Sequence, residues 1–175
     1  MFLELSKDEL FAVMKNLVYT FNWAWIRSEM AIAEKYGLDA AAIGEQFTEL
    51  FREFGSRQAR KLVDLSIIPG TDVDSIIKGF QFSHWSLFEN IKLRRLSDSV
   101  ARMRTIDCSL QRNSRAKWGM AYPCKNTKFS SEWRIGFAKG INPKAEVKCS
   151  YCTPDPRPKD IPENVSCDWI ITIPS

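Results

Sequence analysis

The sequence predicts one α+β domain in which an N-terminal layer of helices packs on a C-terminal antiparallel sheet. Apolar residues recur at three- and four-residue steps over most of residues 1–92, whereas shorter, alternating runs follow in residues 93–175. Helices that precede strands, rather than alternate with them, favour this class over a wound parallel sheet. A length of 175 residues is enough for a single buried core, so no second domain is expected.

The first helix has a well-defined start and end. Ser6 and Glu9 fit a capping box, in which each side chain bonds the backbone amide of the other residue. Gly37 follows Tyr36 as a helix stop, because glycine adopts the left-handed conformation without steric cost. Between these ends runs an apolar stripe at helical spacing, made of Leu10, Val13, Met14, Leu17, Val18, Phe21 and Trp25.

Two further helices are expected in the helical part. One covers residues 39–63, where Gly55 indicates either a kink or the close approach of another backbone. The next begins after Thr71 or Asp72, both of which are good N-caps. Its apolar residues are Ile76, Ile77, Phe80, Trp85 and Phe88.

The sheet part is expected to contain strands, one helix and a proline-rich loop. Four prolines fall within residues 153–164 and cannot belong to a central strand, so this segment is predicted to be a loop. The remaining elements are strands at residues 100–110, 118–122, 145–149 and 167–173 and a helix from Ser130 or Ser131 to Lys139.

Composition and charge exclude several classes of protein. With 45% hydrophobic and 26% charged residues, the chain has the balance of a folded globular protein. A net charge of +4 is too small to predict a nucleic-acid partner. The start of the sequence lacks the basic and apolar regions of a secretion signal, and no run reaches the roughly 18 to 20 apolar residues that span a bilayer. A cytoplasmic location without membrane contact is therefore expected.

The cysteines are the most specific chemical signal. All five follow residue 107, and in a reducing compartment they favour metal binding or free thiols over disulfides. Cys149 and Cys152 form a CxxC pair, which suits one metal when both sulfurs point inward from a tight turn. Cys124 and Cys167 would complete a tetrahedral zinc site or hold an iron–sulfur cluster. The alternative is that these are small, buried side chains of a sheet, as expected for Cys108.

Other residues suit a small-molecule site. His84, the only histidine, is the natural acid or base near neutral pH, unless it simply packs on aromatic rings. Arg102 and Arg104 share one face of a strand and suit a ligand carboxylate or phosphate, or else form a solvated exterior. Trp23 and Trp85 are expected on helices that face the sheet, where an apolar pocket would bind a ligand.

Short motifs carry a resemblance over nearly the whole chain: LSKDEL, Trp23 and Trp25 with Glu29, Tyr36-Gly37, Gly55 with Ala59-Arg60, Gly140 to Pro143, Cys149 to Pro158, and Cys167-Asp168-Trp169. They resemble an uncharacterised family of small prokaryotic cytosolic proteins. That family is similar to the L-2-amino-thiazoline-4-carboxylic acid hydrolases, which share a helical start, a sheet-rich end and a terminal Cys-Asp-aromatic segment. It is also similar to vinyl-reductase-type small-molecule-binding domains. The hydrolase resemblance implies Cys167 or Cys124 as a catalytic residue.

These observations lead to three hypotheses of function. The leading one is a small-molecule-binding or sensing module with a pocket between helices and sheet and a cysteine-bound metal. The alternative is a hydrolase of a small cyclic amide or thiazoline carboxylate, in which a cysteine thiolate attacks and Arg104 holds the carboxylate. The third is a partner-binding protein whose first helix is the face of a homo-oligomer. The sequence does not decide whether the chain is an enzyme.

Overall fold

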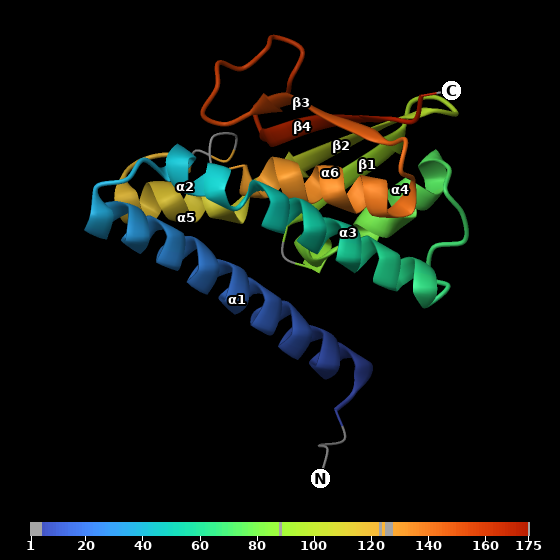
Figure 1. The fold of residues 1–175 in the computed structure, drawn as a ribbon, viewed down its shortest axis with the longest axis horizontal. Coiled ribbons are helices and arrows are strands. Elements are labelled where there is room, and N and C mark those ends of the chain that lie inside the picture. Colours follow the sequence, from blue (N-terminus) through green and yellow to red (C-terminus); the bar gives the residue numbers. More distant parts are fainter. Residues whose placement is uncertain (1–4, 88, 123, 125–127, 175) are drawn as a thin grey trace.

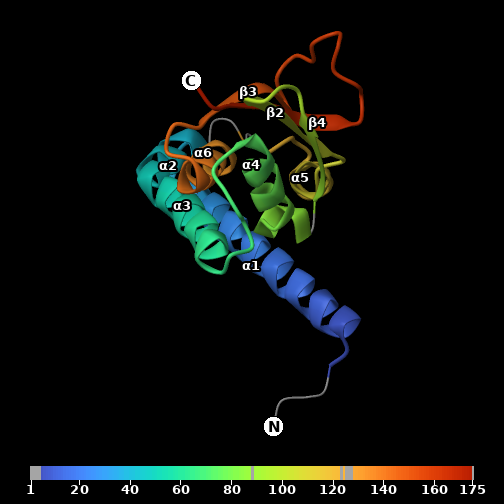
Figure 2. The ribbon, with the colours of Figure 1, turned by 90° about the vertical axis from the view of Figure 1, so that its right-hand side faces the viewer.

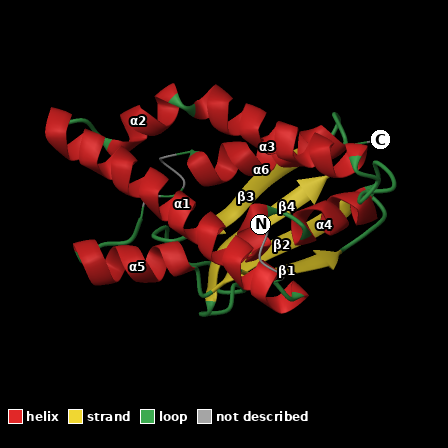
Figure 3. Ribbon diagram, turned by 90° about the horizontal axis from the view of Figure 1, so that it is seen from below, coloured by secondary structure: helices red, strands yellow, loops and turns green. Residues whose placement is uncertain are grey.

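A four-stranded antiparallel sheet forms one side of the molecule, and helices cover one of its faces (Figure 1). The computed structural model describes residues 5–87, 89–122, 124 and 128–174. The predicted α+β class, with the helices first and the strands mostly after them, is confirmed. Figure 3 shows the strands side by side in the order β1-β2-β4-β3. They are β1 (Asn90–Arg95), β2 (Val100–Ile106), β3 (Glu146–Cys152) and β4 (Val165–Thr172).

The helices are α1 (Lys7–Tyr36), α2 (Ala40–Gln46), α3 (Thr48–Asp64), α4 (Val73–Gln81), the 3-10 helix η1 (His84–Leu87), α5 (Ser109–Trp118) and α6 (Phe129–Ile141). They form two layers beneath the sheet (Figures 1 and 2). α4, α5 and α6 lie next to the strands, whereas α1 and α3 form the outer layer. No helix in the described part of the chain has the length and apolar character needed to cross a membrane.

The predicted start and end of the first helix are confirmed. The Ser6 hydroxyl accepts a hydrogen bond from the Glu9 amide, and the Glu9 carboxylate accepts one from the Ser6 amide. Gly37 ends α1 with φ of 61°, the left-handed conformation that favours glycine. Local sequence is therefore sufficient to set both ends of α1.

The next two predicted helices are each interrupted. The first is divided at Phe47 into α2 and α3. The second begins after Asp72 as expected, because the Asp72 carboxylate accepts a hydrogen bond from the Ser75 amide at 2.8 Å. It stops short of Trp85, which lies in η1, and Phe88 lies outside the described residues. The helical period continues across both breaks because the side chains on either side pack into one core.

The predicted strands at residues 100–110 and 118–122 are wrong in part. β2 ends at Ile106, and the chain then turns at Asp107, where φ is 50°, and enters α5. The Glu89 carboxylate accepts hydrogen bonds from the Ser109 amide and hydroxyl, so it caps α5 from 20 residues upstream. A cap supplied from so far away leaves no local sequence signal. Residues 119–122 form no strand.

β1 was not predicted, because charged side chains dominate it. Only Ile91 and Leu93 face the core, while Lys92 pairs with Arg104 and Arg94 with Arg102 across the strands. Two apolar residues are too few to show an alternating pattern.

α3 and α6 cross closely at two glycines. A Cβ atom at Gly55 would collide with the Trp133 carbonyl oxygen, and one at Gly136 with the Arg52 carbonyl oxygen. The predicted role of Gly55, a close approach of another backbone, is thus confirmed. Next to the crossing, Arg52 forms an ion pair with Glu132 at 2.7 Å. The crossing joins the outer helix layer to the inner one.

We expect Gly136→Ala to lower the free energy of unfolding by about 3 kcal/mol, because the methyl group forces two backbones apart. In a helix with open space around the glycine, the same change would instead raise the free energy of unfolding by up to about 1 kcal/mol. The sign of the change therefore tells a tight crossing from an open one. Urea denaturation measures the change. Gly70→Ala is the control, because only the Ser75 hydroxyl lies near its added Cβ. Equal losses in the two variants would contradict a tight crossing.

The proline-rich segment 153–164 is a loop, as predicted, and it lies on the outer face of the sheet (Figure 1). Ile161 of this loop packs with Tyr151 and Val165 in a small second apolar cluster. The Arg157 guanidinium lies over the Tyr151 ring, 4.8 Å from its centroid. The loop therefore covers part of the face that the helices leave open.

Candidate functional site

A bulge in β3 brings both cysteines of the CxxC pair to the helix-covered face of the sheet. Cys149 and Cys152 are three residues apart, so a regular strand would place them on opposite faces. The register shifts after Cys149, so that Cys149 pairs with Trp169 and Cys152 pairs with Cys167. Both side chains consequently pack against the core. The expectation of a tight turn is wrong, but both sulfurs lie on one side of the sheet.

Cys124, Cys149, Cys152 and Cys167, the four predicted metal ligands, meet in one place, and we call them the thiol cluster. The Sγ atoms of Cys152 and Cys167 lie 2.8 Å apart. Hydrogen bonds also link the Cys152 thiol to those of Cys124 and Cys149. Gln111 Nε2 donates a hydrogen bond to Cys124 Sγ at 3.2 Å. The structure therefore gathers four thiols from three separate segments of the chain.

Three thiols of the cluster, those of Cys124, Cys152 and Cys167, favour the protonated form because their pKa values are raised. Hydrogen bonds with Cys124 and then Cys149 raise the pKa of Cys152. The hydrogen bond with Cys152, followed by burial, raises the pKa of Cys167 well above its usual range. The hydrogen bond with Cys152 lowers the pKa of Cys124, but burial and neighbouring thiols make the net shift upward. Neutral thiols are poor nucleophiles and must lose protons to bind a metal.

The thiol cluster is packed too tightly to be a preformed metal site. In the described part of the chain, no three histidine, cysteine, aspartate or glutamate side chains are arranged to hold a metal ion. Two sulfurs on one tetrahedral zinc, each bonded at about 2.3 Å, lie about 3.8 Å apart. The Cys152 and Cys167 sulfurs, at 2.8 Å, would have to separate by about 1 Å to bind zinc together.

A buried cation, Arg134 of α6, lies beside the thiol cluster. Only 3% of the residue is exposed, and its guanidinium lies over the rings of Trp85 at 5.5 Å and Trp169 at 4.8 Å. Arg134 Nη1 donates to the Ser130 carbonyl at 2.8 Å. Among the described residues its Nε finds no acceptor and no carboxylate pairs with it. Its positive charge opposes part of the upward shift in the pKa of the Cys167 thiol.

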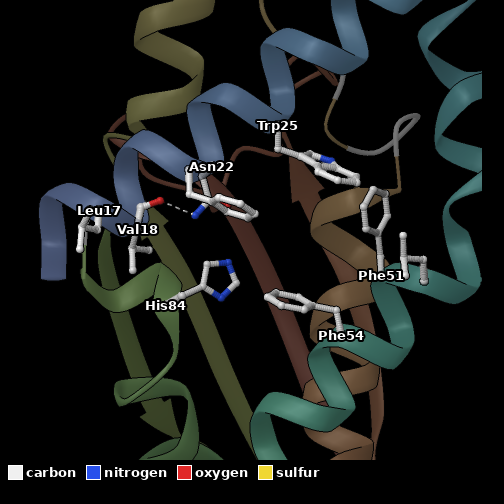
Figure 4. Close-up of a pocket in the computed structure, with 9 residues that line it drawn as sticks. Leu17, Val18, Asn22, Trp25, Phe51, Phe54 and His84 are labelled. Atoms are coloured by element: carbon white, nitrogen blue, oxygen red, sulfur yellow. Dashed lines mark hydrogen bonds between the residues drawn. The ribbon is translucent and has the colours of Figure 1, made fainter.

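An apolar groove of about 470 Å³ lies between α1 and α3 (Figure 4). The Trp25 and Phe51 rings meet edge to face, with centroids 6.1 Å apart, and His84 of η1 points into the space between the helices. No charged side chain is among the described residues that line it. The described residues that line the groove are Leu17, Val18, Phe21, Asn22 and Trp25 of α1, Leu50, Phe51 and Phe54 of α3, and His84.

His84 is a neutral side chain of this groove. Its Nδ1 lies 3.1 Å from Gln58 Oε1, and its ring packs edge to face on Trp133 with centroids 4.6 Å apart. Burial, and then the charge of Arg134, lowers the pKa of His84 to about 3. A histidine with so low a pKa is neutral near neutral pH, so it has no imidazolium proton to give as an acid and is a weak base. Its role as a catalytic acid or base stays a prediction, and this environment disfavours it.

Comparison with known proteins places the chain in a family. Residues 3–173 match the model of a family of unknown function, DUF6125. The chain belongs to this family. No curated protein and no solved structure matches the chain. Because the DUF6125 match brings no activity with it, the similarity to thiazoline carboxylate hydrolases and to vinyl-reductase-type domains stays a prediction.

The structure places the four residues predicted to bind a ligand in three different parts of this DUF6125 chain. Arg102 and Arg104 lie on the outer face of the sheet, where they approach the buried Asp168 carboxylate at 3.4 and 2.9 Å. Trp85 lies in the core. Trp23 lines a separate hollow between α1 and α5. The alternation of side chains along a strand explains why both arginines lie on the outer face, because Met103 between them faces the helices.

The α1 tryptophan that lines the groove is Trp25, which was not among the predicted ligand-binding residues. Trp23 and Trp25 point to opposite sides of α1, because side chains two positions apart on a helix are rotated by about 200° about its axis. The signal was present in the sequence. Leu17, Phe21 and Trp25 repeat at four-residue steps, and so do Val18 and Asn22 beside them.

The hydrolase alternative needs Arg104 near a cysteine nucleophile, and the structure does not bring them together. Arg104 pairs with Asp168, the residue that follows Cys167. Adjacent residues of a strand point to opposite faces, so the guanidinium and the Cys167 thiol lie on opposite sides of the sheet. Cys124, the other candidate nucleophile, forms a hydrogen bond with the Cys152 thiol. It therefore also lies on the helix-covered side of the sheet, away from Arg104. A catalytic role for either cysteine stays a prediction.

Proposed function

We propose that the chain binds a small, uncharged, apolar or aromatic molecule in the groove between α1 and α3. The observation that carries the proposal is the lining of that groove. Apart from Asn22 and His84, the described residues of the lining have hydrocarbon or aromatic side chains. They surround a space of about 470 Å³. Pockets of about 300–1,000 Å³ with few polar groups are typical of small-molecule sites.

The charge of the groove narrows the class of ligand. His84 is neutral, since its pKa is lowered to about 3, and Asn22 Nδ2 already donates to the Val18 carbonyl at 2.8 Å. A ligand carboxylate would therefore lose its hydration without gaining a counter-charge from the lining, which is costly. This supports a neutral ligand over the thiazoline carboxylate that the hydrolase alternative requires.

A neutral fluorescent probe, N-phenyl-1-naphthylamine, tests the groove. We expect saturable binding at one site per chain, and we expect Val18→Trp to weaken it at least tenfold by filling the space. Trp23→Phe is the matched control, because Trp23 lies outside the groove. Fluorescence titration measures both variants. Unsaturable binding, or the same loss in both variants, would exclude a ligand site in the groove.

We further propose that the thiol cluster binds zinc or an iron–sulfur cluster through its sulfurs, once the thiols lose their protons and the Cys152 and Cys167 sulfurs move apart. The observation that favours this is Arg134, a buried cation for which the described residues supply no carboxylate. A buried charge without a counter-charge is strongly destabilising. Four thiolates around a metal carry net negative charge, so metal binding would supply the counter-charge that Arg134 needs. The metal would hold together β3, β4 and the segment containing Cys124.

A further inference from the structure

The N-terminal half of α1 extends away from the rest of the molecule (Figure 2). It carries a row of exposed apolar side chains. Leu10, Met14, Leu17 and Phe21 form the row, at steps of four, three and four residues. They are 50%, 47%, 63% and 68% exposed. Phe11 and Val13 flank them and are also exposed.

This exposed row continues into the rim of the groove. Leu17 and Phe21 belong to both, and on the opposite rim Leu50 and Phe54 of α3 are each 48% exposed. Together, the exposed row, the flanking Phe11 and Val13 and the rim present on the order of 800 Å² of apolar surface, taking about half of each of these eight side chains. The largest apolar patch of an ordinary monomer is about 300–600 Å², whereas a stable dimer buries about 800 Å² on each partner.

We propose that a second copy of the chain covers this surface, with the two α1 helices packed antiparallel about a two-fold axis between Met14 and Leu17. Apolar residues at alternating four- and three-residue steps are the spacing with which two helices interlock. In an antiparallel pair, Leu10 and Met14 of each copy lie over the other copy's Phe21 and Leu17, with Leu50 and Phe54 beside them. The same surface then serves both partners, as two-fold symmetry requires.

Other occupants fit the surface less well. From Leu10 to Phe21 the row is about 16 Å long, which is more than a small ligand in the groove would cover. Residues 5–21 carry two basic side chains, Lys7 and Lys15, and two acidic ones, Asp8 and Glu9. A helix without net positive charge is not attracted to an anionic lipid surface. Lys7 continues the spacing at the N-terminal end of the row, whereas Asp8, Glu9 and Lys15 lie off it.

The pairing also completes the proposed ligand site, although it does not depend on a ligand. Leu17 and Phe21 leave the groove open to solvent on one side. The second α1 would close that side, so that a ligand would be enclosed by residues of both copies.

Sedimentation equilibrium of the full chain without ligand tests the pairing. We expect wild type at 50 μM to sediment at twice its chain mass of 20.1 kDa. Leu10→Glu combined with Met14→Glu should sediment as a monomer at the same concentration, with helical circular dichroism unchanged, because both side chains are exposed within one chain. Asn16→Glu, on the far side of α1, is the control and should remain dimeric.

A monomeric wild type would overturn the proposal, and so would a double glutamate variant that stays dimeric. Should the double variant lose its helical signal, Leu10→Ala with Met14→Ala replaces it and should raise the dimer Kd at least tenfold. Flotation with neutral and with anionic vesicles tests the membrane explanation, and vesicle binding by a monomeric wild type would favour it. The probe titration of the groove is independent, because it can succeed on a monomer and fail on a dimer.

Discussion

Cys152→Ser is expected to remove metal from the protein and to lower the free energy of unfolding by about 3–4 kcal/mol. That loss corresponds to free metal at about 100 to 1,000 times its Kd. Cys152 has the largest effect because its thiol contacts those of Cys124, Cys149 and Cys167. Serine keeps the size of the side chain but is a poor ligand for zinc or iron. Elemental analysis of anaerobically purified protein and urea denaturation measure the two changes, and the metal that is found separates zinc from an iron–sulfur cluster.

Cys108→Ala is the matched control for this prediction. Cys108 is buried near the thiol cluster, but its Sγ lies 3.9 Å from Glu89 Oε1 and it is not one of the four proposed ligands. Its replacement should leave the metal content unchanged and cost only about 1–2 kcal/mol of packing. If wild type contains no metal and cannot be loaded with zinc or iron, the thiols are simply buried side chains. Equal metal loss in both variants would show that the ligand set is different.

Arg134→Met should have opposite effects on the metal-loaded and the metal-free protein. In the loaded protein the guanidinium faces thiolates, so its removal should weaken metal binding about 10–100-fold. In the metal-free protein the thiols favour the protonated form. Arg134 is then a buried charge without a carboxylate partner among the described residues. Methionine should therefore stabilise the metal-free protein by about 2 kcal/mol. Chelator competition measures the affinity, and urea denaturation with and without chelator measures the stability.

Arg104→Met is the control for Arg134→Met. It removes a guanidinium that pairs with the buried Asp168 carboxylate at 2.9 Å, on the other face of the sheet. The resulting destabilisation should be the same with and without metal, because no thiol is involved. If Arg134→Met destabilises the metal-free protein as well, Arg134 contributes packing rather than a counter-charge.

Part of the candidate site was predictable because it depends on residue type alone. The four cysteines were selected as one set because a CxxC pair and two further thiols suit one metal, and the structure does gather them. Arg134 was not predictable. A single arginine on an amphipathic helix is normally exposed, whereas this one is buried with its guanidinium over the Trp85 and Trp169 rings.

Local chemistry in the sequence determined the ends of α1, the start of α4, the proline-rich loop and the order of helices and strands. Each rests on neighbours in the chain, such as the Ser6–Glu9 capping box, the left-handed Gly37 or the Asp72 cap. The tertiary structure decided where segments distant in sequence meet. Glu89 starts α5 from 20 residues away, and pairing of β3 with β4 sets the bulge that turns Cys149 and Cys152 to one face. Such contacts form only when the chain closes long loops, so no local pattern encodes them.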